Sequence, residues 1–223
     1  MSISKNIETV VSTFQKGRKL SEQELGLEEL ISELNKIEPR YRSVVFEGAS
    51  MGVALANSLE TWKTYANATM EHQTQVHIGL GWAIAEQQLD LPSILSHIEP
   101  DLQLKVLDGY GYWHGLFRRR LTIRTQEIPK NIAIGFQSGF DQGVGRSIWY
   151  ATKGDVAKVL NIINHFSEER RPNLWQGIGV AATYVGGCSG THQDELRSVA
   201  RPYSANFDDG VSHATLSMQR SLS

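Results

Sequence analysis

Apolar residues recur along this chain at the spacing of helices rather than of strands. In one stretch Leu174, Ile178 and Val185 fall on a single helical face, and in another Phe140 and Val144 do so. Residues three and four apart share a face only in a helix, whereas strand residues alternate. The pattern predicts an all-α protein.

Six of these helical segments carry the same small-x-small core. The first glycines of successive copies lie 31, 30, 34, 34 and 33 residues apart. One helix pair every 30 to 34 residues is typical of an α-solenoid-like array, here of about six helix pairs with Gly-x-Gly inner helices. The six cores are 48–50, 79–81, 109–111, 143–145, 177–179 and 210–212.

The motif glycines predict close contact between the inner helices. A glycine inside a helix costs about 1 kcal/mol relative to alanine, so tight packing must offset that cost. Positions i and i+4 share one face of a helix, while position i+2 points elsewhere. We therefore expect each inner helix to be approached closely by neighbours on two sides.

The remaining amphipathic segments predict outer helices and an N-terminal element. Residues 1–40 contain two helical stretches, at about 4–17 and 22–37, which we interpret as a helical cap or arm. Residues 41–223 form the helical-repeat domain, and the whole chain is expected to be a single compact domain. The clearest outer helices are predicted at 91–98, 155–166 and 193–201.

Polar and aromatic side chains follow one stripe beside the motif glycines. The residue before each first glycine and the residue three after it lie on a common helical stripe. Inner helices that curve around one concave face would gather these side chains into a pocket with acidic, basic and aromatic walls. The candidate catalytic residues are Glu47, His77, Asp108, His114, Asp141, Arg146 and Asp209. The candidate substrate-binding residues are Trp82, Tyr112, Gln142, Trp149, Gln176 and His213.

Two interpretations of this stripe are open. The functional one is acid–base chemistry or polar-group capture in a partly apolar cavity, where burial separates carboxyl pKa values. The structural one is helix capping or ion pairing, in which Asp141, Asp208 and Asp209 cap helix N-termini. Arg146 is the strongest single candidate, because its guanidinium can pair with Asp141 or hold an anionic substrate.

Composition excludes several classes of function. The 223 residues carry a net charge of −2 and are 40% hydrophobic, which fits a globular protein and gives no basic surface for nucleic acid. The single Cys188 excludes a disulfide framework and a multi-thiolate zinc site. It lies in a glycine-rich segment near His192, which favours a turn over a nucleophile. Because no apolar run has the length of a signal or a membrane span, we expect a cytoplasmic protein.

Other chemical motifs fail on spacing. Gly-x-Gly lacks the third glycine and the preceding strand of a dinucleotide loop, and neither Gly-Lys-Ser/Thr nor His-Glu-x-x-His occurs. We therefore expect no cofactor and no metal. The basic cluster Arg118–Arg120 with Arg124 could hold phosphate or an acidic partner surface, but a solvated helix end is favoured because cations suit helix C-termini.

Several longer strings carry a resemblance to a known family. From about Tyr41 to Tyr203 the chain resembles the bacterial domain-of-unknown-function family found in enediyne biosynthetic gene cassettes. That resemblance implies a role in making or maturing a polyketide-derived or similar unsaturated natural product, and it supplies no mechanism. The strings that carry it are 46–52, 76–83, 107–111 with His114 and Phe117, 140–149, and 174–179 with 184–187.

Two function hypotheses follow. In the first, an enzyme acts on a long unsaturated apolar substrate, such as a polyene or isoprenoid, by acid–base cyclisation or isomerisation. Its aromatic residues line the cavity and stabilise cationic character. In the second, a non-catalytic helical-repeat module shields an intermediate or assembles partner enzymes. Other biosynthetic enzymes and a second copy of the chain are candidate partners. The enzyme is favoured because the polar residues differ from copy to copy.

Overall fold

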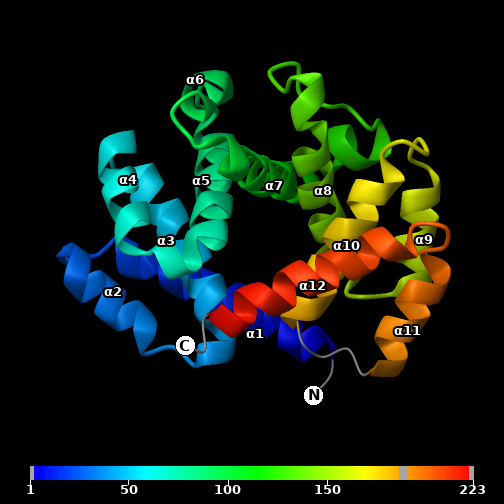
Figure 1. The fold of residues 1–223 in the computed structure, drawn as a ribbon, viewed down its shortest axis with the longest axis horizontal. Coiled ribbons are helices and arrows are strands. Elements are labelled where there is room, and N and C mark those ends of the chain that lie inside the picture. The colour runs from blue at the N-terminus through cyan, green and yellow to red at the C-terminus, as the bar shows by residue number, and fades with distance from the viewer. Residues whose placement is uncertain (1–2, 186–189, 221–223) are drawn as a thin grey trace.

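The glycine-bearing segments all form long helices in the computed structural model, which describes residues 3–185 and 190–220 (Figure 1). Within those residues there is no strand, so the predicted all-α fold is confirmed. Cys188 and its neighbours Gly186 and Gly187 lie outside the described residues. The long helices are α1 (Ile3–Ser21), α3 (Pro39–Ala56), α5 (Gln73–Gln87), α7 (Pro100–Phe117), α8 (Gln137–Thr152), α10 (Arg171–Val185) and α12 (Ser204–Arg220).

Shorter helices connect the long ones and lie at the periphery (Figure 1). The segments predicted as outer helices at 91–98, 155–166 and 193–201 form α6, α9 and α11. The N-terminal stretches predicted at 4–17 and 22–37 form α1 and α2. The short elements are α2 (Leu27–Asn35), α4 (Leu59–Ala68), η1 (Met70–His72), α6 (Leu91–Leu95), η2 (Arg120–Arg124), η3 (Ile134–Phe136), α9 (Val156–Asn164) and α11 (Gly190–Val199).

The long helices pack against one another in chain order. Helix α1 packs on α3, and the row continues through α5, α7, α8 and α10 to α12. In an open solenoid each unit contacts only its neighbours. Here α1 also contacts α10, and α12 contacts α3, so the row curves until its ends meet. This curvature encloses an interior lined by several long helices at once.

The motif glycines lie where two long helices touch backbone to backbone. A methyl group added to Gly79 would overlap the carbonyl oxygen of Glu47 in α3. One added to Gly81, two residues later, would overlap that of Val106 in α7. The contact is reciprocal, because Gly109 of α7 lies against the backbone of α5 at Ile78. The predicted close approach of neighbours on two sides of each Gly-x-Gly helix is confirmed.

Helix α1 joins this row through the same kind of contact. Gly17 lies against the backbone of α3 at Val45, and Gly48 of α3 lies against the backbone of α1 at Phe14. Gly17 has no glycine two residues away, so it does not belong to the Gly-x-Gly pattern. The N-terminal helix is thus held as tightly to α3 as the motif helices are to one another.

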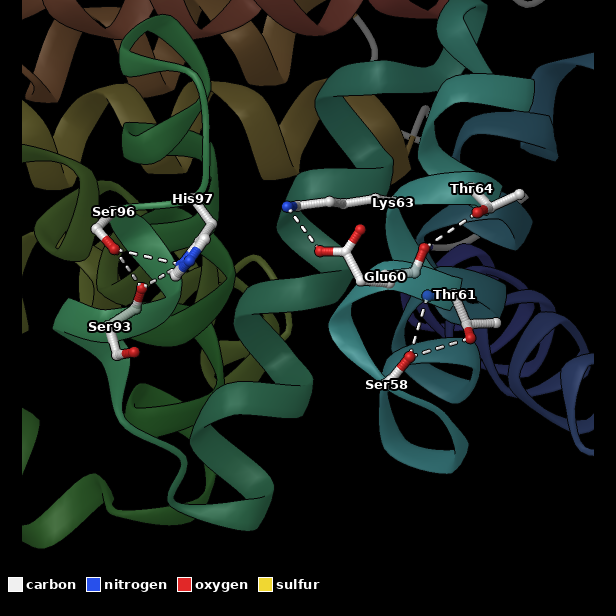
Figure 2. Close-up of polar contacts among 8 residues, drawn as sticks. All are labelled: Ser58, Glu60, Thr61, Lys63, Thr64, Ser93, Ser96 and His97. Atoms are coloured by element: carbon white, nitrogen blue, oxygen red, sulfur yellow. Dashed lines mark hydrogen bonds and ion pairs between the residues drawn. The ribbon is translucent and has the colours of Figure 1, made fainter.

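The outer helices are held at their ends by local hydrogen bonds. Ser58 caps α4 by accepting a hydrogen bond from the backbone nitrogen of Thr61 at 3.3 Å (Figure 2). Just after α6, the Nδ1 atom of His97 lies 2.8 Å from the carbonyl oxygen of Ser93. These contacts stay within each outer segment. Substitutions there therefore test the periphery without changing the interior.

Candidate functional site

A cavity of about 370 Å³ opens between α1, α3, α5, α7 and α8. Its volume falls within the range of roughly 300–1,000 Å³ that is usual for small-molecule sites. Most of its lining is apolar, with aliphatic and aromatic side chains together. The aromatic lining residues are Phe14, Trp82, Tyr112, Phe117 and Tyr150.

The floor of this cavity is a buried cluster of charged side chains from three helices. Arg146 of α8 donates from Nη2 to both carboxylate oxygens of Glu47 in α3, at 3.2 and 3.4 Å. Its Nη1 donates to Oδ1 of Asp108 in α7 at 3.1 Å. All three side chains are at most 6% exposed. Since the three residues are about 40 to 100 positions apart in sequence, only the curvature of the helix row brings them together.

Aromatic side chains surround this charge cluster and bond to it. Trp82 donates from Nε1 to Oε1 of Glu47 at 3.1 Å. The guanidinium carbon of Arg146 lies 4.5 Å from the ring centroid of Tyr112, which is a cation–π contact. The Tyr112 hydroxyl is hydrogen-bonded to that of Tyr150. The floor is therefore both charged and shielded from bulk water.

Burial changes the proton affinities of the floor residues. It raises the pKa of Glu47 above its ordinary value, against the opposing effect of Arg146. Burial alone would lower the pKa of Arg146, but the carboxylates of Glu47 and Asp108 outweigh it, so that pKa lies well above its usual value. Burial also raises the pKa of Tyr112 well above 10. Glu47 is thus a carboxyl group that takes up a proton more readily than an exposed glutamate.

One hydrogen-bond donor of the floor is left unused. The Nε atom of Arg146 is buried and has no hydrogen-bond partner among residues 3–185 and 190–220. A buried donor without a partner costs about 1–3 kcal/mol.

The opposite end of the cavity reaches the surface through an apolar rim. Val11 of α1 is 42% exposed, and Phe117 at the end of α7 is 63% exposed. Arg18 and Glu86 form an ion pair of 2.9 Å across the same rim. The outer end of the cavity is therefore bordered by exposed apolar side chains and one ion pair.

With this geometry in place, sequence comparison identifies the family. A family model described as "Protein of unknown function (DUF1702)" matches residues 1–222. The chain belongs to the DUF1702 family. Neither a curated protein nor a solved structure matches the DUF1702 chain. The expectation of a domain-of-unknown-function family is confirmed.

Five of the candidate residues of this DUF1702 chain meet at the cavity. Glu47, Trp82, Tyr112 and Arg146 line it, and Asp108 lies directly behind, bound to Arg146. The candidate stripe on α3, α5, α7 and α8 is therefore the stripe that faces the interior. All five were predicted from the sequence as catalytic or substrate-binding residues, and the structure brings them into one network.

Asp141 lies elsewhere and has another partner. The Nε atom of Arg170 is 3.0 Å from both carboxylate oxygens of Asp141, and Arg170 Nη1 donates to the carbonyl oxygen of Gln126 at 2.8 Å. The pairing of Arg146 with Asp141 that the sequence suggested does not occur, because five residues separate them and place them on different faces of α8. Through Arg170, Asp141 joins α8 to the segment between α9 and α10 and to the segment between η2 and η3.

The candidate histidines His77 and His114 occupy two other hollows. His77 packs its ring against the edge of Trp62 and bonds through Nδ1 to the carbonyl oxygen of Gln73. His114 stacks beside Tyr110, with ring centroids 4.5 Å apart. Neither imidazole lines the cavity above Glu47.

The remaining candidates are also outside the cavity. Trp149 is fully buried and packs beside His192, with ring centroids 5.6 Å apart, so it does not form a cavity wall. Gln142 is buried in α8. On α10 and α12, the Nε2 atom of Gln176 lies 3.5 Å from the Nδ1 atom of His213. His213 and Asp209 are both exposed.

The capping interpretation of the stripe is wrong for its acidic members. Asp141 lies in the second turn of α8, and Asp208 and Asp209 lie in the second turn of α12, where no free backbone N–H needs a cap. Two of these three carboxylates instead form ion pairs, as the structural interpretation also allowed. Asp141 pairs with Arg170, and Asp208 pairs with Arg197 at 2.8 Å.

Sequence reasoning missed two tyrosines of the interior. Tyr150 lies four residues after Arg146 and lines the cavity. Tyr184 lies four residues after Val180, and its hydroxyl accepts a hydrogen bond of 2.6 Å from Gln75. Both continue the candidate stripe by one helical turn. Extending that stripe would have found them.

Neither a metal site nor a membrane-spanning helix is found in the described part of the chain. Residues 3–185 and 190–220 contain no group of three or more His, Cys, Asp or Glu side chains that could hold a metal ion. Among the same residues, no helix has both the length and the apolar character needed to cross a membrane. The basic cluster at 118–120 follows the C-terminal end of α7, where positive charges interact favourably with the helix dipole.

The buried histidine His72 predicts a dependence of stability on pH. Its ring stacks on that of Phe46, with ring centroids 3.9 Å apart. Burial, with help from Arg42, lowers its pKa from 6.5 to about 4. Below pH 6.5 the imidazole of His72 takes up a proton in the unfolded chain, whereas in the folded chain it does so only near pH 4. Stability is therefore lost as the pH falls through that window.

We expect His72→Gln to reduce this acid-induced loss by on the order of 2 kcal/mol. Urea unfolding followed by circular dichroism at pH 7, 5.5 and 4.5 measures the effect. The matched control is His97→Gln at the exposed end of α6, which should leave the pH dependence unchanged. Parallel pH profiles for wild type and His72→Gln would refute the assignment.

Proposed function

We propose that this protein is an enzyme of natural-product biosynthesis that binds a long, unsaturated, apolar molecule and isomerises or cyclises it by acid–base chemistry. The single observation that carries the proposal is the placement of Glu47. A carboxyl group with a raised pKa lies at the floor of a cavity whose walls are mostly apolar and include five aromatic residues.

The cavity supports an apolar substrate. Its rim exposes Val11 and Phe117, and its walls carry Phe14 and Trp82, with ring centroids 5.0 Å apart. Burying apolar surface contributes roughly 25 cal/mol per Å², so an aromatic and aliphatic wall favours a hydrocarbon ligand over a polar one. A polyene or an isoprenoid chain has this character.

Glu47 supports the chemistry. In its protonated form it can donate a proton to an alkene carbon, and its carboxylate can then remove a proton from a different carbon. The product of those two transfers is an isomer of the substrate, and if a second double bond attacks the cation in between, the product is a ring. Arg146 and Trp82 hold the Glu47 carboxyl group in place, while the faces of Trp82 and Tyr112 stabilise the intermediate positive charge.

The resemblance to the family of enediyne biosynthetic gene cassettes supports the choice of substrate class. Products of such cassettes are unsaturated and polyketide-derived, and a cavity with mostly apolar walls suits their precursors. We therefore extend the proposal to a role beside other biosynthetic enzymes of such a pathway.

The test is turnover of linear polyenes and isoprenoid alcohols, followed by liquid chromatography and mass spectrometry for a product of unchanged mass. General acid–base groups contribute about 10²–10⁴-fold in rate, so Glu47→Gln is expected to lower turnover at least about 100-fold. The variant retains a hydrogen-bonding side chain of the same size, and binding should persist. Quenching of tryptophan fluorescence measures that binding.

Two further variants complete the experiment. Ala151→Phe fills the cavity from α8 and should abolish both binding and turnover. Glu168→Gln, whose side chain is 83% exposed, should behave as wild type. Full turnover by Glu47→Gln would refute the acid–base role. Binding without turnover by the wild type would favour the non-catalytic module that shields an intermediate.

A further inference from the structure

A basic surface lies where the chain leaves α7. Residues 117–126 contain four arginines and no acidic residue, so this segment has a charge of +4 in a chain whose net charge is −2. All four arginines are exposed, and among residues 3–185 and 190–220 none of them forms an ion pair. The favourable effect of the α7 dipole falls off within the last turn, so it does not account for the whole group. The four are Arg118, Arg119, Arg120 and Arg124.

Two large apolar side chains are exposed among these arginines. Phe117 is 63% exposed, and Leu121 is 44% exposed. The next residue, Thr122, is buried and donates from its hydroxyl group to the carbonyl oxygen of His114 at 3.3 Å, which holds η2 against the end of α7. Segments that lie on a membrane combine the same two features, because their apolar side chains enter the interface while their basic side chains attract anionic lipids.

The outer end of the cavity lies at the same end of the molecule. Its lining residues Glu86, Phe117 and Ala151 belong to the last turns of α5, α7 and α8, and Phe117 belongs to the basic surface as well. An apolar ligand leaves water for the hydrocarbon region of a bilayer. Contact between this surface and a membrane would therefore bring the outer end of the cavity to the place where such a ligand concentrates.

From these observations we propose that residues 117–124 dock on the surface of an anionic lipid bilayer and that the cavity takes its ligand from that bilayer. The docking depends only on the charge and the exposed apolar side chains, whereas the delivery of a ligand rests on the proposed function. A bilayer fits this surface better than an acidic protein does, because a bilayer both accepts exposed apolar side chains and holds the apolar ligand.

Binding of the full chain to lipid vesicles tests the docking. The vesicles consist of phosphatidylcholine alone or with about one third phosphatidylglycerol, and co-sedimentation measures the bound fraction. Each arginine near an anionic bilayer contributes about fivefold in affinity. At about 50 mM NaCl we expect binding to the anionic vesicles to be at least about tenfold tighter than to the neutral ones. Most of that difference should disappear at about 500 mM NaCl, where salt screens the charges.

Substitutions at exposed positions locate the surface that binds. Arg119→Gln with Arg120→Gln should weaken binding to anionic vesicles at least about tenfold. Leu121→Ser should weaken it at least about threefold and leave its salt dependence unchanged. The matched control is Lys36→Gln with Lys158→Gln, which also removes two positive charges, but from exposed positions on α2 and α9, and should change the affinity less than about twofold. Circular dichroism at 222 nm checks that each variant is folded.

Three results would overturn the docking surface. The first is equal binding to the two kinds of vesicle. The second is an equal loss of binding in the arginine pair and in the lysine pair, because the attraction would then come from overall charge. The third is no binding to anionic vesicles, which would favour an acidic protein partner or a solvated helix end.

Turnover separates this proposal from the proposed function. With a polyene dissolved in anionic vesicles, Arg119→Gln with Arg120→Gln should lower turnover at least about tenfold, whereas the same variant should match wild type on substrate supplied in solution. Turnover in solution by a wild type that does not bind vesicles would overturn the docking alone. Vesicle binding without any turnover would remove the proposed function and the delivery of a ligand, and it would leave the docking surface in place.

Discussion

Gly109→Ala is expected to destabilise the protein by at least about 3 kcal/mol. An added methyl group would overlap the carbonyl oxygen, carbon and Cα atoms of Ile78 in the neighbouring helix α5. These are backbone atoms, so no side chain can rotate away to relieve the overlap. The helices would have to move apart, and the packing of α7 on both neighbours would suffer.

The expected loss of stability has the opposite sign to the usual effect of this substitution. Replacing glycine by alanine inside a helix normally stabilises it by about 1 kcal/mol. Urea unfolding followed by circular dichroism at 222 nm measures the difference. Gly135→Ala is the matched control, because nothing lies within 4 Å of a methyl group added there, and we expect a change below about 0.5 kcal/mol. Equal stability of the two variants would contradict backbone contact between α5 and α7.

Arg146→Met is expected to cost about 3–5 kcal/mol, because it leaves Glu47 and Asp108 buried without a counterion. The loss should be smallest at low pH. Burial already raises the pKa of Glu47, and loss of Arg146 removes the main opposing effect, so the folded variant takes up this proton more readily than the unfolded chain and the difference from wild type grows as the pH rises.

Charge removal should rescue this variant. In the Arg146→Met background, Glu47→Gln with Asp108→Asn removes both unpaired charges, and we expect at least half of the lost stability to return. Thermal unfolding of the single and triple variants at pH 5 and pH 8 provides the comparison. A triple variant as unstable as Arg146→Met would show that the arginine acts through packing rather than charge.

The repeat of small residues was enough to predict the helices and their close packing. The spacing of Gly79 and Gly81 places two small residues on opposite sides of one helix, and the structure uses both sides. Closure of the row was not predictable, because it depends on contacts of α1 with α10 and of α12 with α3. The helices of each pair lie far apart in sequence, and the small-x-small motif does not indicate which distant helices touch.

The candidate site could be predicted only in part, because it also depends on how the row of helices curves. A stripe on each helix follows from periodicity, so Glu47, Asp108 and Arg146 could be named without a structure. Which stripes face one interior depends on the curvature of the row. Asp209 lies on that stripe and His77 directly beside it, but Asp209 is exposed and His77 packs against Trp62.

The reciprocal glycine contacts also bear on how such a cavity can diverge. Because backbone meets backbone at Gly79, Gly81 and Gly109, the spacing of the walls does not depend on the residues that line the space between them. Lining positions such as Met51 and Ala151 can then change in size without shifting a helix. The scaffold and the specificity of this protein are encoded by separate sets of residues, so related chains can acquire new ligands through side-chain exchange alone.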